Sequence, residues 1–430
     1  MKRFLLLVLI PALLICFAGC NQTTTPTTTA ATADTTVPEE TQFTFPLSLT
    51  AEEEAILQQR RDIAESYARE SLTLLWRSSE PLAYGLAARD NGTLLCIVPN
   101  RLYKGLPYAY GCGTKTAFLE YAGEPDENGI YTISGLSPAA LDYGTYGARV
   151  GNDCSSVVTN AWSLIGTSFT TCMSSTMFGD FGAIPVGEYD FCVPISPETG
   201  RITDTSVVAT QNGKQTLFAA YAQLQKADAL FRQSSGGSNH TMMIVDVHVV
   251  YAEGLIDGDK SYVTVLEQTR SNFTKGVTEI HPELNELVYV IGGVDKVYKF
   301  NSLFNSAYLP VTIKELRDPS PVEDAWVKDS ETELSIDKLF TGTISSNMFI
   351  DTVQITILDE KDQIVQSVAG RAKRRYNKEF ELERFTTESP KSMKGSIDLE
   401  ALKSGAYRCT LTARLNDGQE FTVRDFPFTK

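Results

Sequence analysis

The sequence predicts an α+β domain followed by an all-β domain. A long helix is indicated from Thr50 to about residues 78–81, because Thr50 and Glu53 have the spacing of a capping box and apolar residues then recur at helical intervals. Runs rich in branched apolar residues predict buried strands at residues 94–98, 241–251 and 262–269. In the C-terminal part of the chain, short alternating runs separated by turn signals indicate a β-sandwich.

The first twenty residues have the pattern of a secretory signal. Lys2 and Arg3 precede an apolar run that ends at Phe17, and Ala-Gly-Cys20 follows. The stretch resembles a bacterial lipoprotein signal, in which small residues precede a lipidated cysteine, although that family usually has leucine at the position of Phe17. A transmembrane anchor is the weaker alternative, because the apolar run is short for a bilayer. We expect residues 1–20 to be a lipoprotein signal whose Cys20 is anchored to the cell membrane, on its extracytoplasmic side.

Residues 21–48 are rich in threonine and proline and have no apolar periodicity. Such a segment buries too little apolar surface to offset the entropy lost on ordering, so a disordered tether is predicted. The whole chain carries 53 acidic and 38 basic residues. Because a polyanion needs a basic binding surface, this balance argues against nucleic acid as a partner.

Cys154 stands at the predicted start of a helix. Gly151, Asn152 and Asp153 precede it, and apolar residues follow at helical spacing until Gly166. The unpaired N–H groups and the dipole of a helix N-terminus stabilise a thiolate relative to a thiol, which makes the sulfur a better nucleophile. The alternative is a small buried cysteine at the start of an ordinary amphipathic helix. Residues elsewhere in the chain are needed to distinguish these two interpretations.

A cysteine nucleophile needs a base, and His240 is the best placed of the three histidines. A helix predicted over residues 216–231 and a glycine-rich loop lead to His240, which stands directly before a predicted strand. If that strand is straight, His248 lies about 26 Å beyond His240 at roughly 3.3 Å per residue, too far to share its site. His281 precedes a proline in a polar stretch and is predicted to lie in a loop.

The strand at residues 262–269 contains Glu267 and Gln268, whose side chains face opposite sides. An Asp-Gly turn precedes this strand and predicts antiparallel pairing with the strand that follows His240. A further apolar run at residues 287–292 is expected to extend the same sheet.

The cysteines give no sign of a metal site. The chain contains no Cys-x-x-Cys pair and no His-x-x-x-His pair, so we expect no metal ion and no other cofactor. Cys409 is expected to be buried in mid-strand. If Cys154 is a free nucleophile, the other cysteines of its domain can form up to two disulfides; these cysteines are Cys96, Cys112, Cys172 and Cys192. The preferred pair is Cys172 with Cys192.

The sequence Asp-Pro-Ser-Pro at residues 318–321 predicts a domain boundary. One domain is assigned to residues 49–317, and a β-sandwich of the immunoglobulin-like kind to residues 322–430. The second domain contains no histidine, so it has no nucleophile and base pair. Its strands are expected at residues 354–358, 364–367, 380–382, 407–414 and 420–424.

Four segments together carry a resemblance to a known family. They are Gly-Leu-Pro-Tyr-Ala-Tyr-Gly at 105–111, Asn-Asp-Cys-Ser-Ser-Val at 152–157, Lys-Ala-Asp-Ala-Leu at 226–230 and Asn-His-Thr-Met-Met-Ile at 239–244. In this order they resemble the NlpC-type cysteine peptidases of bacterial cell walls, which are papain-like in fold and related to the CHAP amidases. The resemblance spans roughly residues 95–300 and implies that residues 49–317 form a papain-like catalytic domain with an N-terminal helix.

The resemblance implies a role for each matching residue. Cys154 is expected to be the nucleophile and His240 its base. Tyr108 is expected to lie beside the thiolate and help to form the oxyanion site, and Asp153 to precede the nucleophile. The implied activity is cleavage of an amide bond in peptidoglycan stem peptides, near D-Glu and a diamino acid, through an acyl-enzyme.

Alternatives remain open for the third catalytic residue and at two places where the chain differs from the family pattern. Glu267 matches the position used by the CHAP branch, whereas Gln268 matches the NlpC pattern; we prefer Glu267, because a carboxylate both orients an imidazole and stabilises its protonated form. Ser156 stands where the family commonly has glycine, and the interval from Tyr108 to Cys154 is longer than usual. The competing hypothesis is a non-catalytic surface lipoprotein that binds cell-wall glycan or a protein partner.

Overall fold

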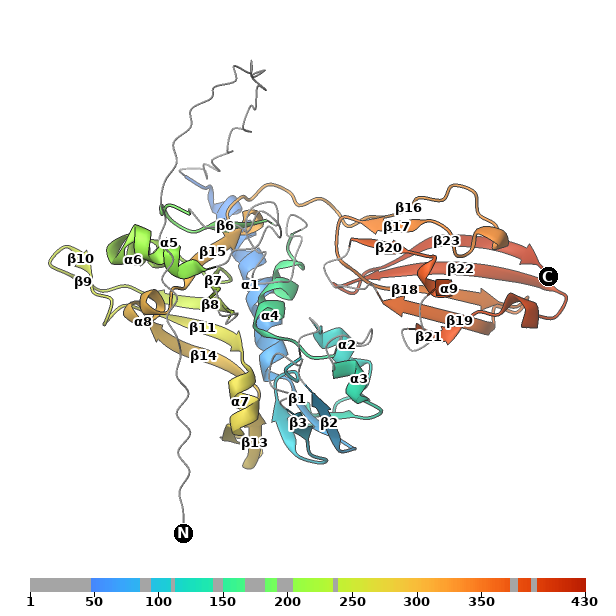
Figure 1. Ribbon diagram of the computed structural model, residues 1–430, viewed down its shortest axis with the longest axis horizontal. Coiled ribbons are helices and arrows are strands. Elements are labelled where there is room, and N and C mark those ends of the chain that lie inside the picture. The colour runs from blue at the N-terminus through green and yellow to red at the C-terminus, as the bar shows by residue number, and fades with distance from the viewer. Residues whose placement is uncertain are drawn as a thin grey trace, which may run out of the picture. The chain divides into compact units, whose positions relative to one another are not determined.

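The computed structural model describes residues 48–85, 94–109, 113–141, 150–166, 182–191, 204–234, 239–371, 378–387 and 393–430. The expected signal with Cys20 and the tether up to residue 47 lie outside the described residues, as do Cys112, Cys172 and Cys192 with the preferred disulfide. Within the described part of the chain, no helix is long and apolar enough to cross a membrane. Helices combine with several β-sheets, and the C-terminal part is rich in strands, so the α+β class is as expected (Figure 1).

The first helix, α1 (Ala51–Thr73), begins at the expected capping box. The Thr50 hydroxyl accepts a hydrogen bond from the Glu53 N–H at 3.2 Å, and the Glu53 carboxylate accepts one from the Thr50 N–H at 2.7 Å. The sequence placed the end of this helix near residues 78–81, which is too late. The chain instead enters strand β1 (Leu75–Ser78) directly after α1.

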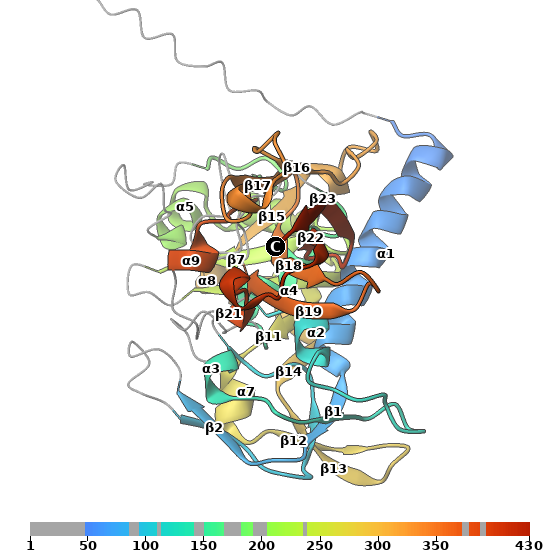
Figure 2. The same ribbon diagram turned by 90° about the vertical axis from the view of Figure 1, so that its right-hand side faces the viewer.

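Six antiparallel strands form the central sheet, in the order β14-β11-β8-β7-β15-β6. One face packs against α1 and α4 (Cys154–Trp162), and the other against α6 (Lys214–Tyr221) and α8 (Phe300–Asn305) (Figures 1 and 2). Along β8, apolar side chains alternate between the two cores, as in a strand that is buried on both faces. The strands are β6 (Ala183–Pro185), β7 (Ala229–Arg232), β8 (His240–His248), β11 (Tyr262–Gln268), β14 (Gly292–Lys299) and β15 (Leu309–Ile313).

The helix expected over residues 216–231 is wrong in its second half. Helix α6 ends at Tyr221, and residues 229–232 form β7. Between them Ala227 adopts φ +67°, which no right-handed helix contains, and its N–H donates to the Ile244 carbonyl oxygen of β8 at 2.9 Å. Pairing with distant strands therefore decides the conformation here, against the local helical spacing.

The apolar run at residues 287–292 does not extend the central sheet as a single strand. Most of it forms β13 (Glu286–Val290), which pairs with β12 and β4 in a second sheet of order β12-β13-β4-β1-β5. The central sheet is extended instead by β14, which begins at Gly292. The chain thus changes sheets within two residues. The other strands of this half are β2 (Leu82–Gly85), β3 (Leu94–Ile97), β4 (Leu102–Lys104), β5 (Tyr131–Ile133), β9 (Tyr251–Ala252), β10 (Leu255–Ile256) and β12 (Thr278–His281).

The C-terminal part contains two antiparallel sheets that share one hydrophobic core, in the orders β16-β17-β20 and β21-β19-β18-β22-β23. The expected hairpin is present, because β22 and β23 pair across residues 416–418. Cys409 is fully buried in β22, as expected. The strands are β16 (Val327–Asp329), β17 (Thr343–Ser346), β18 (Ile350–Leu358), β19 (Ile364–Arg371), β20 (Glu379–Glu381), β21 (Met393–Ser396), β22 (Ala406–Leu415) and β23 (Glu420–Thr429). The remaining α-helices are α2 (Lys115–Leu119), α3 (Pro138–Leu141), α5 (Thr205–Asn212), α7 (Arg270–Lys275) and α9 (Arg384–Thr387).

Candidate active site

The loop before Cys154 is held by backbone contacts with residues 107–109. Gly151 has φ +94°, and a Cβ there would lie 2.3 Å from the Pro107 carbonyl oxygen, so a larger residue does not fit. The Asn152 N–H donates to the same carbonyl oxygen at 3.0 Å, and the Asn152 carbonyl accepts from the Ala109 N–H at 3.1 Å. The close approach of the two chain segments therefore requires Gly151, and the backbone of Asn152 joins them.

Asp153 is the N-cap of α4. Its Oδ1 atom accepts hydrogen bonds from the N–H groups of Ser155 at 3.1 Å and Ser156 at 2.9 Å. In return, the Ser156 hydroxyl accepts the N–H of Asp153 at 2.6 Å, which completes a capping box. The serine that replaces the usual glycine of the resembling family thus adds a hydrogen bond to this turn. Asp153 itself orients the start of the helix.

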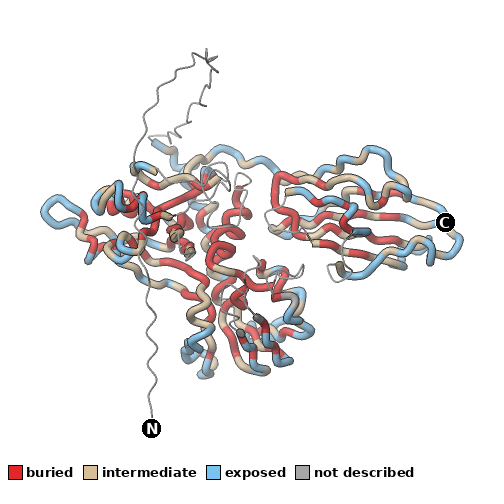
Figure 3. Tube along the Cα trace, in the orientation of Figure 1, coloured by how far each residue is buried: buried red, intermediate tan, exposed pale blue. Residues whose placement is uncertain are grey.

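Cys154 is the first residue of α4, and 9% of its surface is exposed. All nine residues of this helix are buried, so it is fixed in the core (Figure 3). The N–H groups of Ser155 and Ser156 are taken by the cap, whereas the N–H of Cys154 donates to no residue in the described part of the chain. That N–H group is available to an oxyanion formed on a carbonyl that the sulfur attacks.

His240 is the first residue of β8 and connects Cys154 with Glu267. Its Nε2 atom lies 2.6 Å from Glu267 Oε2, and Cys154 is near enough to act on the pKa of the ring. Burial lowers the pKa of His240, but its interactions with Cys154 and Glu267 outweigh burial and raise the pKa to about 9. The imidazole is therefore protonated at neutral pH and lies between two acidic groups.

Glu267 has a side chain that is only 4% exposed, yet its carboxylate is fully hydrogen-bonded. Besides His240 it accepts two bonds on Oε1, from Lys296 Nζ at 2.7 Å and from Tyr298 Oη at 3.0 Å, both in β14. Burial raises the pKa of Glu267, but the bonds and charges of His240 and Lys296 lower it to about 2. Lys296 and Tyr298 were not predicted as site residues, because their only local signal is that they lie two residues apart and so share a face of a strand.

Gln268 faces the other side of the strand, as the sequence indicated. Its Nε2 atom donates to the Leu106 carbonyl oxygen and to Asn152 Oδ1, both at 2.8 Å. The side chain is fully buried. The structure therefore brings Glu267 to His240, whereas Gln268 ties the loop before Cys154 to the central sheet.

Tyr108 lies beside the loop that precedes Cys154. It forms a parallel bridge with Asn152, and its carbonyl oxygen accepts a hydrogen bond from the Tyr84 hydroxyl at 3.0 Å. The other two histidines lie elsewhere: the His248 ring stacks on Tyr262 at a centroid distance of 4.8 Å, and His281 lies in β12. His281 was expected in a loop, and its place in a strand corrects that prediction.

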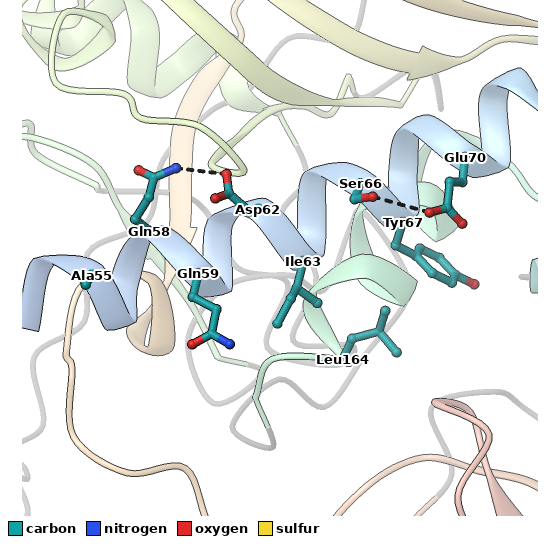
Figure 4. Close-up of a pocket in the computed structure, with 9 residues that line it drawn as sticks. All are labelled: Ala55, Gln58, Gln59, Asp62, Ile63, Ser66, Tyr67, Glu70 and Leu164. Carbon is teal, nitrogen blue, oxygen red and sulfur yellow. Dashed lines mark hydrogen bonds between the residues drawn. The ribbon is translucent and has the colours of Figure 1, made fainter.

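Two other features do not belong to this constellation. No group of three or more His, Cys, Asp or Glu side chains within the described residues is arranged to hold a metal ion. A surface groove runs along α1 and contains neither Cys154, His240 nor Glu267 (Figure 4). Its lining residues are Ala55, Gln58, Gln59, Asp62, Ile63, Ser66, Tyr67, Glu70 and Leu164.

Comparison with known proteins gives no relative of this chain. No family model matches it, and no curated protein matches it. Among solved structures, the crystal structure of a tetra-tandem repeat in the extending region of a large adhesion protein matches with 11% identity and a TM-score of 0.18. The match covers 47% of this chain and 40% of that one. A likeness at this level carries no argument about fold or function.

Proposed function

We propose that this chain is an extracytoplasmic cysteine peptidase or amidase that cleaves an amide bond in peptidoglycan stem peptides. The observation that carries the proposal is that His240 lies between two groups, with its Nε2 atom 2.6 Å from Glu267 Oε2 and with Cys154 near enough to raise the pKa of its ring. A cysteine at a helix start, paired with an imidazole that a carboxylate orients, is the arrangement that nucleophilic catalysis by a thiol requires. A structural cysteine needs none of these partners.

The reaction begins with Cys154 as thiolate and His240 as imidazolium. The sulfur attacks the carbonyl carbon of the scissile amide, and the negative oxygen that forms is stabilised by the Cys154 N–H, with Tyr108 beside it. His240 then donates its proton to the leaving nitrogen, the C–N bond breaks and an acyl-enzyme remains. Next, His240 accepts a proton from water, and the resulting hydroxide attacks the thioester. This step releases a carboxylic acid and regenerates the thiolate–imidazolium pair.

Glu267 supports the charged form of His240 in this scheme. Its Oε2 atom lies 2.6 Å from His240 Nε2, and its pKa of about 2 keeps it ionised over the whole working range. A carboxylate in this position selects one ring orientation and stabilises the imidazolium. The neutral amide of Gln268, on the opposite side of the strand, supplies neither effect.

The substrate class follows from the resemblance to NlpC-type peptidases. The four matching segments include the loop before Cys154 and the start of β8, which are the parts that build the site. On this proposal the domain is papain-like, the C-terminal part is an immunoglobulin-like β-sandwich, and a lipid on Cys20 holds the protein at the outer side of the cell membrane. No metal or other cofactor takes part.

The test is digestion of purified cell wall followed by mass spectrometry of the soluble products. The wild-type protein should release peptides with a new amino group and a new carboxyl group at one amide bond. The Cys154→Ala variant, which keeps the helix start but lacks the sulfur, should release none. Binding of wall fragments by both proteins without any release would contradict the proposal and favour the non-catalytic surface lipoprotein.

A further inference from the structure

Tyr308 directly precedes β15, and its ring lies against the imidazole of His240. The two rings meet edge-on, at a centroid distance of 6.3 Å. The Tyr308 N–H donates to the Leu303 carbonyl oxygen at 3.0 Å, and the Tyr308 carbonyl oxygen accepts the Tyr221 hydroxyl at 2.6 Å. The side chain belongs to the core between the central sheet and helices α6 and α8. Backbone hydrogen bonds and packing therefore hold this ring beside His240.

The hydroxyl of Tyr308 makes no hydrogen bond with any residue in the part of the chain that the structure describes, although only 6% of the residue is exposed. A tyrosine hydroxyl that is this deeply buried usually has a partner, because an unmade hydrogen bond costs free energy. Three other tyrosines packed in the cores follow this rule: the hydroxyls of Tyr84, Tyr189 and Tyr221 each donate to a backbone carbonyl oxygen. The Tyr308 hydroxyl is therefore a donor that the described residues leave unused.

The groups that act on this hydroxyl place it within the candidate active site. Burial is the largest cause that raises the pKa of Tyr308, Arg232 acts against the rise, and Glu267 and Cys154 are among the groups that add to it. The hydroxyl is thus near both the sulfur and the carboxylate of the site. Because its pKa is raised, the phenol stays protonated at neutral pH and remains a hydrogen-bond donor.

We propose that Tyr308 is a further catalytic residue, whose hydroxyl donates a hydrogen bond to the oxyanion that forms when Cys154 attacks the scissile carbonyl. The proposal rests on the function proposed above. An oxyanion site commonly combines two donors, and the Cys154 N–H supplies one of them. The resemblance names Tyr108 for the second, whereas the unused hydroxyl beside His240 belongs to Tyr308. A hydrogen bond to an oxyanion is stronger than one to a neutral carbonyl, so this contact favours the transition state over bound substrate.

Tyr308→Phe removes the hydroxyl and keeps the ring beside His240. On a synthetic soluble stem peptide, kcat should fall about a hundredfold, as for the loss of one oxyanion donor, with KM nearly unchanged. The free energy of unfolding should not fall, because the deleted hydroxyl has no partner to leave unpaired. The matched control is Tyr189→Phe, which deletes a hydroxyl that donates to the Pro310 carbonyl oxygen at 2.9 Å. This control should lower the free energy of unfolding and keep kcat.

Thiol alkylation separates a contact with the oxyanion from a role in positioning His240. Iodoacetamide reacts with the sulfur by displacement of iodide and forms no oxyanion, so Cys154 of the Tyr308→Phe protein should be alkylated at the wild-type rate. A slower alkylation would show that Tyr308 acts through His240, and would overturn the proposal. An unchanged kcat, or a raised KM with unchanged kcat, would overturn it too. If kcat falls in Tyr108→Phe and not in Tyr308→Phe, the role belongs to Tyr108.

A small aldehyde keeps the test independent of the natural substrate. Acetyl-glycinal adds to a nucleophilic thiol: the S–C bond forms, and the carbonyl oxygen takes up the proton of the thiol and imidazole pair. That oxygen occupies the place of the oxyanion, so the Kd of the adduct should be about tenfold higher for Tyr308→Phe than for the wild type, as NMR of the aldehyde signal measures. If the wild-type protein cleaves no stem peptide, the proposed function fails. Equal Kd values, or no adduct with the wild-type protein, would contradict the role of Tyr308.

Discussion

Tyr298 Oη donates a hydrogen bond to Glu267 Oε1 at 3.0 Å, although the two residues are 31 positions apart. The same oxygen accepts a hydrogen bond from Lys296 Nζ at 2.7 Å, and the other carboxylate oxygen, Oε2, interacts with His240. The two side chains of strand β14 thus hold the Glu267 carboxylate so that Oε2 points toward His240. Because an unpaired buried charge is costly, both partners also make burial of Glu267 tolerable.

The Tyr298→Phe variant tests whether this orientation matters for the reaction. It removes one charge-assisted hydrogen bond and keeps the ring, so we expect kcat to fall by roughly tenfold, corresponding to about 1.4 kcal/mol, with KM nearly unchanged. The matched control is Tyr407→Phe, which removes a hydroxyl that hydrogen-bonds to the Lys403 carbonyl in the C-terminal part. If both variants have the same kcat as the wild type, the β14 partners are structural only.

Glu267→Gln and Gln268→Ala separate the two neighbouring candidates for the third catalytic residue. The first variant should lower turnover by roughly a hundredfold or more while the protein stays folded, because a neutral amide does not stabilise the imidazolium. The second should mainly lower the free energy of unfolding, since Gln268 ties Leu106 and Asn152 together. Turnover on wall fragments and urea unfolding measure the two effects. A larger turnover defect in the folded Gln268→Ala protein would reverse the assignment.

The pH dependence of activity should reflect the imidazolium. Since the pKa of His240 is raised to about 9, kcat/KM should hold at neutral pH and fall as the pH rises through about 9. Replacing Glu267 by Gln removes one cause of the raised pKa, so this alkaline limb should move to lower pH. An alkaline limb at the same pH in both proteins would show that Glu267 does not act on His240.

The same ionisations predict a pH dependence of stability. The raised pKa of His240 contributes stability that is fully present below about 6.5 and is lost as the pH rises through about 9. The lowered pKa of Glu267 contributes stability that is present above about 4.5 and is lost as the pH falls through about 2. The difference in unfolding free energy between wild type and Glu267→Gln should therefore be greatest near pH 5 to 6.5. Urea unfolding from pH 3 to 9.5 measures it, and a constant difference would contradict the coupling.

Thiol alkylation gives an independent test of the nucleophile. Cys154 should react with iodoacetamide faster than Cys96, which is exposed, and far faster than Cys409, whose burial raises its pKa to about 12. Peptide mapping by mass spectrometry assigns the rates. His240→Ala should slow the reaction of Cys154 and leave that of Cys96 unchanged. Equal rates for Cys154 and Cys96 in the wild-type protein would remove the nucleophile assignment.

The sequence predicted those features that depend on residues close together in the chain. The capping box at Thr50 and the helix start at Cys154 each depend on side chains within a few residues, so a single sequence displays them. The partners of Glu267 in β14 and the strand conformation of residues 229–232 depend on pairing between segments far apart in the chain. No short window contains that information, which is why helical spacing misled the prediction for β7.

The last prediction concerns the C-terminal part, whose core is separate from the cores around the central sheet except at Phe349. A truncation should be placed after Pro321, because Arg60 of α1 donates hydrogen bonds to the carbonyl oxygens of Asp318 and Ser320, both at 2.7 Å. Cutting earlier would remove these contacts together with the C-terminal part. A cut after Pro321 keeps these contacts and removes only the segments that follow.

The truncated protein should keep its rate on a small soluble peptide and lose rate on insoluble wall. The proposed catalytic residues Cys154, His240 and Glu267 all lie before the cut, whereas a second module that binds the polymer would raise the local concentration of substrate without altering the chemical step. Phe349 belongs to the same hydrophobic cluster as Trp162, so the cut uncovers some apolar surface and the protein must first be shown to be monodisperse. If a monodisperse truncated protein has lost its activity on the soluble peptide, the C-terminal part is needed to form the catalytic site and the division at residues 318–321 is wrong.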